Sequence, residues 1–78
     1  MNILPKPVQF MNDVELIECL AFNIGLSFYE IKKLFNQKID GQSFLLMEKK
    51  HIAELGILDR YYKICMLFPM GKFVDDFI

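Results

Sequence analysis

Few side chains in this sequence have the type and spacing that chemistry at a protein site requires. His51 is the only histidine, and a metal site or a catalytic triad built on it would need further partners. The two cysteines, Cys19 and Cys65, fall on the apolar faces of separate expected helices and are interpreted as small buried hydrophobes. We therefore expect no metal site, with His51 at the surface or half-buried on a short helix.

Asp75 and Asp76 are the only adjacent carboxylates, and paired carboxylates can serve general acid and base chemistry. They lie close to the C-terminal end with no base nearby, so we expect a solvated turn. The sequence contains no glycine-rich phosphate loop, nucleophile elbow or zinc-ligand spacing. We accordingly expect no catalytic residue, no cofactor and no enzymatic activity.

Composition indicates one small globular domain. The chain has 78 residues, of which 54% are hydrophobic, and eight Phe and three Tyr provide large buried areas. A small domain this rich in apolar residues should leave part of its apolar surface exposed. An exposed apolar patch usually marks a surface that binds a partner. The net charge of −1 argues against nucleic acid or an anionic membrane as the main partner. With no apolar run long enough for a membrane span or signal peptide, we expect a soluble intracellular protein, cytoplasmic or nuclear.

The stretch Ile39–Ile57 organises the rest of the chain. It predicts two very short helices, of which Asp40 caps the first and Gly41 relieves the preceding turn. Ile52 and Leu55 lie on one face of the second, and the following glycine is placed to end it. Neither helix could be stable alone, so longer helices must support them on both sides.

Two helices are expected before this stretch. The first begins after Asn12, which forms a capping-box pattern with Glu15, and runs to about Phe22. The second follows Ser27, a capping residue, and ends near Gln37. The residues expected to face the core are Leu16, Ile17, Leu20 and Ala21 of the first helix and Phe28, Ile31, Leu34 and Phe35 of the second.

The last helix should begin around residues 58–60. Pro69 and Gly71 should stop or kink it. Its expected core residues are Tyr61, Ile64 and Cys65, with Leu67 or Phe68. Residues 1–10, which contain two prolines, are expected to form an extended arm. Residues 69–78 are expected to form either a tail or a continuation of the helix, which leaves a domain over residues 11–68.

In this order of helices the chain resembles a sterile alpha motif (SAM) domain. The resemblance covers about residues 11–68 and rests on Ile39-Asp40-Gly41, Leu45-Leu46, Leu55-Gly56-Ile57 and Lys63-Ile64. It implies an all-α fold, a compact five-helix bundle with short middle helices and a longer C-terminal helix. The chain departs from the family pattern at Tyr61, where a glycine often opens the last helix of members that assemble.

The resemblance implies a protein-protein interaction module, and we expect hetero-association with another SAM domain in a signalling or regulatory scaffold. Two surfaces are implied. The last-helix surface comprises Leu58, Arg60, Tyr61, Tyr62 and Lys63, and the mid-region surface comprises Lys38, Asp40, Gln42, Glu48 and Lys49. One of the two tyrosines should be in the core and the other exposed. Replacing both Arg60 and Lys63 by Glu should abolish binding without affecting the fold.

Two alternative functions are a homo-oligomerising SAM domain and RNA-hairpin binding. Head-to-tail assembly is disfavoured because the mid-region is mixed to basic and would meet the basic start of another last helix. The lysines involved are Lys32, Lys33, Lys38, Lys49 and Lys50, which could also serve only to keep an apolar domain soluble. RNA binding is disfavoured because the loop 23–27 carries no basic residue, unlike the basic patch of the SAM domains that resemble Smaug.

Overall fold

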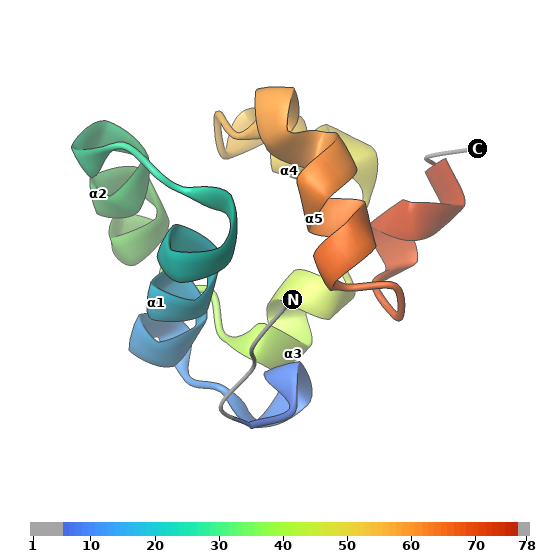
Figure 1. Cartoon of the computed structure of the whole chain (residues 1–78), viewed down its shortest axis with the longest axis horizontal. Helices are drawn as coiled ribbons and strands as arrows, with labels where there is room; N and C mark the ends of the chain where they lie inside the picture. Colours follow the sequence, from blue (N-terminus) through green and yellow to red (C-terminus); the bar gives the residue numbers. More distant parts are fainter. Residues whose placement is uncertain (1–5, 77–78) are drawn as a thin grey trace.

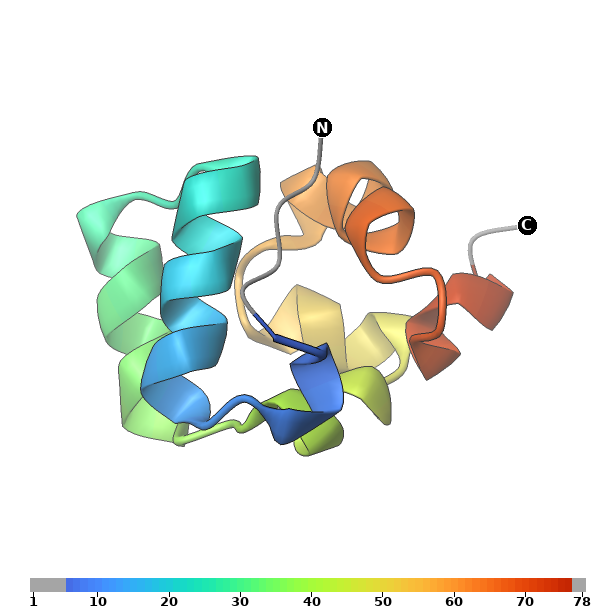
Figure 2. The same cartoon turned by 60° about the horizontal axis from the view of Figure 1, so that its bottom comes forward.

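The computed structural model describes residues 6–76, and within them the chain is helical with no strand. The expected all-α class is therefore confirmed. The described elements, in chain order, are η1 (Val8–Phe10), α1 (Asp13–Ile24), α2 (Phe28–Gln37), α3 (Gly41–Leu45), α4 (Lys49–Glu54), η2 (Leu58–Arg60), α5 (Tyr61–Leu67) and η3 (Lys72–Asp76), where η denotes a 3-10 helix. Helices α1 and α2 form an antiparallel pair on one side of the molecule, and α4, α5 and η3 lie on the other (Figures 1 and 2).

Side-chain caps set the start of both long helices, as the sequence predicts. The Asn12 side chain accepts a hydrogen bond from the Glu15 N–H at 2.8 Å, and the Glu15 carboxylate accepts one from the Asn12 N–H at 2.9 Å. At α2 the Ser27 hydroxyl accepts from the Glu30 N–H at 3.2 Å, and the Glu30 carboxylate accepts from the Ser27 N–H at 2.8 Å. These reciprocal bonds satisfy N–H groups that have no partner within the helix. Helix α1 continues two residues past the expected end, to Ile24.

The short helix α3 is held from outside by η1, which packs directly on it. The Asp40 carboxylate caps α3 by accepting from the Ser43 N–H at 2.8 Å. The Gly41 N–H donates to the Met11 carbonyl at 2.9 Å, and a Cβ at Gly41 would lie 1.7 Å from the Val8 carbonyl oxygen. Glycine is therefore required here by a close approach between two backbones, and not only by the turn before the helix.

His51 caps α4, a role that its type and position did not predict. Its Nδ1 accepts a hydrogen bond from the Glu48 N–H at 3.0 Å, and the ring is half-buried. The expected half-buried histidine on a short helix is confirmed. Gly56, which follows α4, has a φ of 80°, in the left-handed region that favours glycine.

The core is centred on three phenylalanines from separate parts of the chain. The Phe44 ring makes edge-to-face contacts with the rings of Phe68 and Phe73, each with 5.4 Å between centroids. All three side chains are fully buried. The residues around them that the sequence correctly assigned to the core are Leu16, Ile17, Cys19, Leu20, Leu34, Tyr61, Ile64 and Cys65. Leu67 and Phe68, of which one was expected in the core, are both buried. Ala21 and Ile31 are half-buried.

Both ends of the described chain contribute more to the domain than the sequence predicted. Residues 8–10 form the 3-10 helix η1 instead of an extended arm, and Val8 is fully buried. Helix α5 has seven residues and is longer than the middle helices α3 and α4, which have five and six, as expected, although it is shorter than α1 and α2. Pro69 lacks the N–H that a further turn would need, and the chain turns back to bury Phe73 within η3. Residues 1–5 of the expected arm and residues 77–78 of the expected tail lie outside the described residues.

The expectation that Phe28 and Phe35 face the core is also wrong. Phe28 is 82% exposed and Phe35 is 51% exposed, whereas Glu30 and Leu34 are the buried residues of α2. The helical spacing correctly identified an apolar stripe on α2, but this stripe is not the face that packs on the core. The core-facing side includes the carboxylate of Glu30, and a search for apolar residues does not assign a charged residue to the core. This helix therefore leaves aromatic side chains on the outside of the molecule.

Candidate interaction surfaces

Tyr61 belongs to the core and not to the last-helix surface, which corrects its assignment to partner binding. Its hydroxyl donates a hydrogen bond to the Phe73 carbonyl oxygen, and its side chain is buried. Burial, followed by the neighbouring Cys65 thiol, raises the pKa of Tyr61 to about 12. The Lys49 ammonium lies 5.3 Å from the centroid of the ring. Tyr61 thus joins α5 to η3, and Tyr62 is the exposed tyrosine of the pair.

Arg60 also has a structural role that the sequence did not predict. Its guanidinium forms an ion pair with the carboxylate of Glu30, a buried residue of α2. The hydrogen bond from the Ser27 backbone and the Arg60 charge hold the pKa of Glu30 below its usual value. Reversing the Arg60 charge would place two carboxylates side by side, so we now expect the double replacement of Arg60 and Lys63 by Glu to destabilise the fold as well.

The remaining residues of the last-helix surface are exposed. Leu58 lies in η2 with 41% of its surface accessible, and Lys63 is exposed on α5. Tyr62 is 61% exposed, as is Met66, which follows it by one helical turn. A tyrosine and a methionine on one helix face provide a flexible apolar contact with a polar end, a combination favoured at interfaces.

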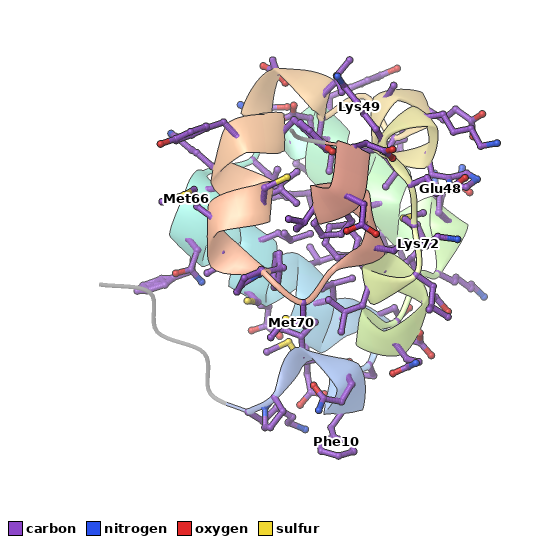
Figure 3. The ribbon with its side chains drawn as sticks, turned by 90° about the vertical axis from the view of Figure 1, so that its right-hand side faces the viewer. Phe10, Glu48, Lys49, Met66, Met70 and Lys72 are labelled. Atoms are coloured by element: carbon purple, nitrogen blue, oxygen red, sulfur yellow. The ribbon has the colours of Figure 1, made fainter. Side chains whose placement is uncertain are left out.

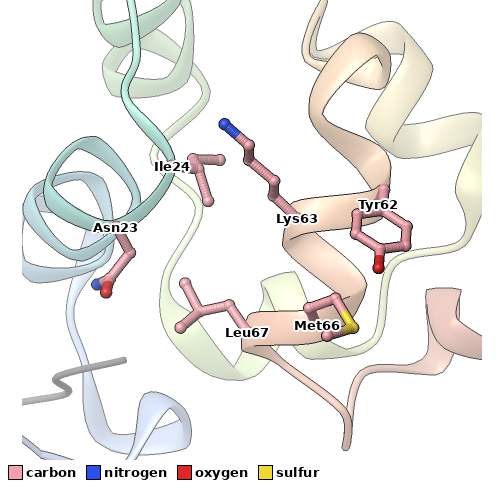
Figure 4. Close-up of a pocket in the computed structure, with 6 residues that line it drawn as sticks. All are labelled: Asn23, Ile24, Tyr62, Lys63, Met66 and Leu67. Carbon is pink, nitrogen blue, oxygen red and sulfur yellow. The ribbon is translucent and has the colours of Figure 1, made fainter. Parts of the chain in front are cut away.

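Tyr62, Lys63 and Met66 border a hollow between α5 and the end of α1. Its volume is about 240 Å³, and Leu67, Ile24 and Asn23 complete the lining. Figure 4 shows Lys63 and Leu67 on the side of α5 that is nearest Ile24 and Asn23, whereas Tyr62 and Met66 lie farther from them along the same helix. The Asn23 amide donates to the Cys19 carbonyl at 2.8 Å, which fixes the α1 side. We refer to these six residues as the α5 hollow.

The sequence indicated Tyr62 and Lys63 but missed Met66, which it could have found because Met66 lies four positions after Tyr62 on the same helix face. Ile24 and Asn23 come from α1, and no local pattern links them to α5. Their placement depends on how the two helices pack, which only the tertiary structure specifies.

The mid-region surface is exposed, but its acids are engaged within the chain. Lys38, Asp40 and Gln42 are exposed, and Asp40 caps α3. Glu48 is half-buried and lies 3.6 Å from the ammonium groups of both Lys50 and Lys72. Figure 3 shows Glu48 and Lys72 together on one face, with Lys49 nearby.

Lys49 is exposed, and its backbone N–H donates to the Asp76 carboxylate at 3.1 Å. This bond ties the start of α4 to η3, so Asp76 is a positioning group and not only part of a solvated turn. Asp75 is exposed.

The two cysteines are buried, as expected, and burial raises the pKa of each thiol. Over residues 6–76, no three His, Cys, Asp or Glu side chains gather in a way that could hold a metal ion. In the same part of the chain, none of the helices has the length and apolar character needed to cross a bilayer.

Comparison with protein-family models, with curated proteins and with solved structures finds no significant match to this chain. The arrangement of its own side chains is therefore the basis on which a function can be proposed.

Proposed function

We propose that this chain is a protein-interaction module of the SAM type, which binds another protein through the α5 hollow and the residues beside it. The partner that fits best is a second, different SAM domain with acidic side chains on its mid-region. Its acids would lie against Lys63, and an apolar side chain would enter the α5 hollow.

The observation that carries this proposal is the exposure of Tyr62 and Met66 at the rim of a hollow. Small domains usually bury side chains of this size, and a large apolar contact area beside a cation is typical of interface centres. Lys63 adds a positive charge that would increase the rate of association with an acidic partner.

The charges of the mid-region support a different protein as partner over head-to-tail assembly of this chain. Glu48 is already paired with Lys50 and Lys72, and Asp40 is engaged as a helix cap, which leaves Lys38 and Lys49 as the exposed cations of that face. The basic residue Lys63 of one copy would meet these lysines of the next. Such contacts between like charges disfavour polymerisation.

The proposal can be tested with a double variant of the α5 hollow, Tyr62→Ala with Lys63→Glu. A matched control is Tyr29→Ala with Lys50→Glu, which makes the same chemical changes at exposed positions elsewhere. Proteins captured from cell extract by the native chain would be identified, and the affinity of each purified partner measured by calorimetry. We expect at least a roughly tenfold weaker affinity for the α5 variant and little change for the control.

Binding should also weaken as the salt concentration rises, because screening reduces the attraction between Lys63 and the acids of the partner. Native affinity in the Tyr62→Ala, Lys63→Glu variant, with its helical content intact, would rule out this surface as the binding site.

A further inference from the structure

The outer face of the α1–α2 pair contains an apolar groove that lies away from the α5 hollow. Its volume is about 430 Å³, and its walls are formed by Val14 and Ile17 from α1 and by Phe28, Ile31 and Phe35 from α2. Three of these side chains are largely accessible to solvent, with Val14 46% exposed and the two phenylalanines more so. Contiguous apolar surface of this kind is unusual on a domain that remains monomeric.

The spacing of the groove residues matches that of helices that pack on other helices. Phe28, Ile31 and Phe35 follow each other at intervals of three and four residues, and Val14 and Ile17 have the same spacing on α1. The adjoining faces of both helices, which include Leu20 and Leu34, are buried in the core. The α1–α2 pair thus has two apolar faces, of which only one is covered within residues 6–76.

The two charged residues of the groove indicate what covers it. Glu18 lies on the α1 wall and Lys32 on the α2 wall, and neither forms an ion pair among the described residues. When a second copy of the groove is rotated by 180° and placed face to face with the first, the acid of each copy meets the base of the other. A second copy of this chain therefore fits the groove in both shape and charge.

We infer that the outer face of α1 and α2 is the interface of a homodimer, in which the groove of one copy packs on the groove of a second copy. A two-fold axis parallel to the helices places α1 of each copy opposite α2 of its partner. Since α1 and α2 are antiparallel within a copy, the four helices form an antiparallel bundle (Figure 2).

The charges select this axis over the alternative one. A two-fold axis perpendicular to the helices would place α1 of one copy on α1 of the other. Glu18 would then lie close to Glu18 of the second copy, and Lys32 close to the second copy's Lys32. The parallel axis instead pairs Glu18 with the partner's Lys32 twice. Because the groove is small compared with obligate dimer interfaces, the dimer should dissociate at micromolar concentrations.

Sedimentation equilibrium of the full chain over a micromolar concentration series tests the inference. The native chain should show a monomer–dimer equilibrium, and Phe28→Ser with Phe35→Ser should abolish the dimer. Both positions are exposed, so circular dichroism should show the native helical content. The Tyr62→Ala, Lys63→Glu variant should dimerise like the native chain. A native chain that stays monomeric throughout, or a dimer that survives the two serine substitutions, would overturn the inference.

Charge substitutions identify the occupant of the groove. Glu18→Lys alone and Lys32→Glu alone should each weaken the dimer about tenfold, because each opposes like charges twice. Mixing these two variants should restore association, since the groove of the first variant then carries two lysines and meets two glutamates in the groove of the second. Folded variants that remain monomeric after mixing would overturn the inference. So would a monomeric native chain that binds a different protein through Phe28.

Discussion

At the scale of single residues, Arg60 and Tyr61 show why neighbouring positions at the start of α5 cannot be interpreted together as one surface. Arg60 pairs with Glu30 of α2, and Tyr61 donates to the Phe73 carbonyl in η3. Both side chains are of types favoured at interfaces, which is why the sequence indicated them. Their partners are distant along the chain, so only the fold reveals that they act within it.

The Glu30–Arg60 pair should stabilise the domain in a pH-dependent way. Arg60→Met leaves the buried Glu30 without its cation, and we expect a loss of about 2 kcal/mol in the free energy of unfolding at neutral pH. Lys63→Met, on an exposed side chain of the following helix α5, should change it by less than about 0.5 kcal/mol. Urea unfolding of both variants measures the difference.

Acid should remove the contribution of Glu30. Its pKa in the folded state lies below the usual value of 4.5, so its stabilisation is present above that pH and is lost as the pH falls through the folded pKa. The difference in stability between the native chain and Glu30→Gln should therefore shrink as urea unfolding is repeated below pH 4.5. A difference that stays constant on acidification would contradict the role of the carboxylate.

The stabilisation that Tyr61 provides is lost at alkaline pH, whereas that of Glu30 is lost in acid. The pKa of Tyr61 is about 12 in the folded state and 10 when unperturbed, so its stabilisation is complete below pH 10 and is lost between these values. Tyr61→Phe should lower the free energy of unfolding by about 1 kcal/mol at pH 7, the typical value of one hydrogen bond. It should also make the decline above pH 10 less steep than in the native chain, and an equally steep decline would count against this assignment.

Gly41 is the residue at which a single methyl group should have the largest effect. Gly41→Ala places a carbon 1.7 Å from the Val8 carbonyl oxygen, so η1 must move away from α3. We expect at least about 2 kcal/mol of destabilisation, and little from Gln42→Ala at the next, exposed position. Thermal unfolding of the two variants provides the comparison, and equal melting temperatures would contradict the close backbone approach.

At the scale of elements, the sequence predicted helix starts better than it predicted which helix faces point inward. The caps at Asn12, Ser27 and Asp40 are local features, because each side chain bonds an N–H within its own first turn. The orientation of α2 is not local. It depends on the Glu30–Arg60 pair, which brings a charged position toward the core and leaves Phe28 outside.

The elements η1 and η3 were not predicted because 3-10 helices of three to five residues have no usable periodicity. Phe73 in η3 nevertheless completes the aromatic core. Phe73→Ala should destabilise the domain by about 3–5 kcal/mol, the usual range for a buried phenylalanine. Phe10→Ala, in the exposed part of η1, should have little effect on chemical unfolding. A small effect of Phe73→Ala would mean that η3 is not part of the cooperative unit.

At the scale of the whole molecule, two exposed apolar features lie on separate faces, the α5 hollow and the groove of α1 and α2. The sequence indicated the first through Tyr62 and Lys63 but missed the second, since Phe28 and Phe35 were assigned to the core. A dimer formed through the groove would carry two α5 hollows. Such a molecule could bind two partner domains at once and gain avidity from the second contact.

Binding of a partner protein at the α5 hollow, as proposed, can be observed in an NMR titration. The amide signals of the 15N-labelled chain would be followed as a purified partner is added. We expect the largest shifts on residues 23–24 and 62–67, on both sides of the hollow. Shifts centred on α3 and α4, with the amides of α5 unchanged, would contradict the proposed binding site.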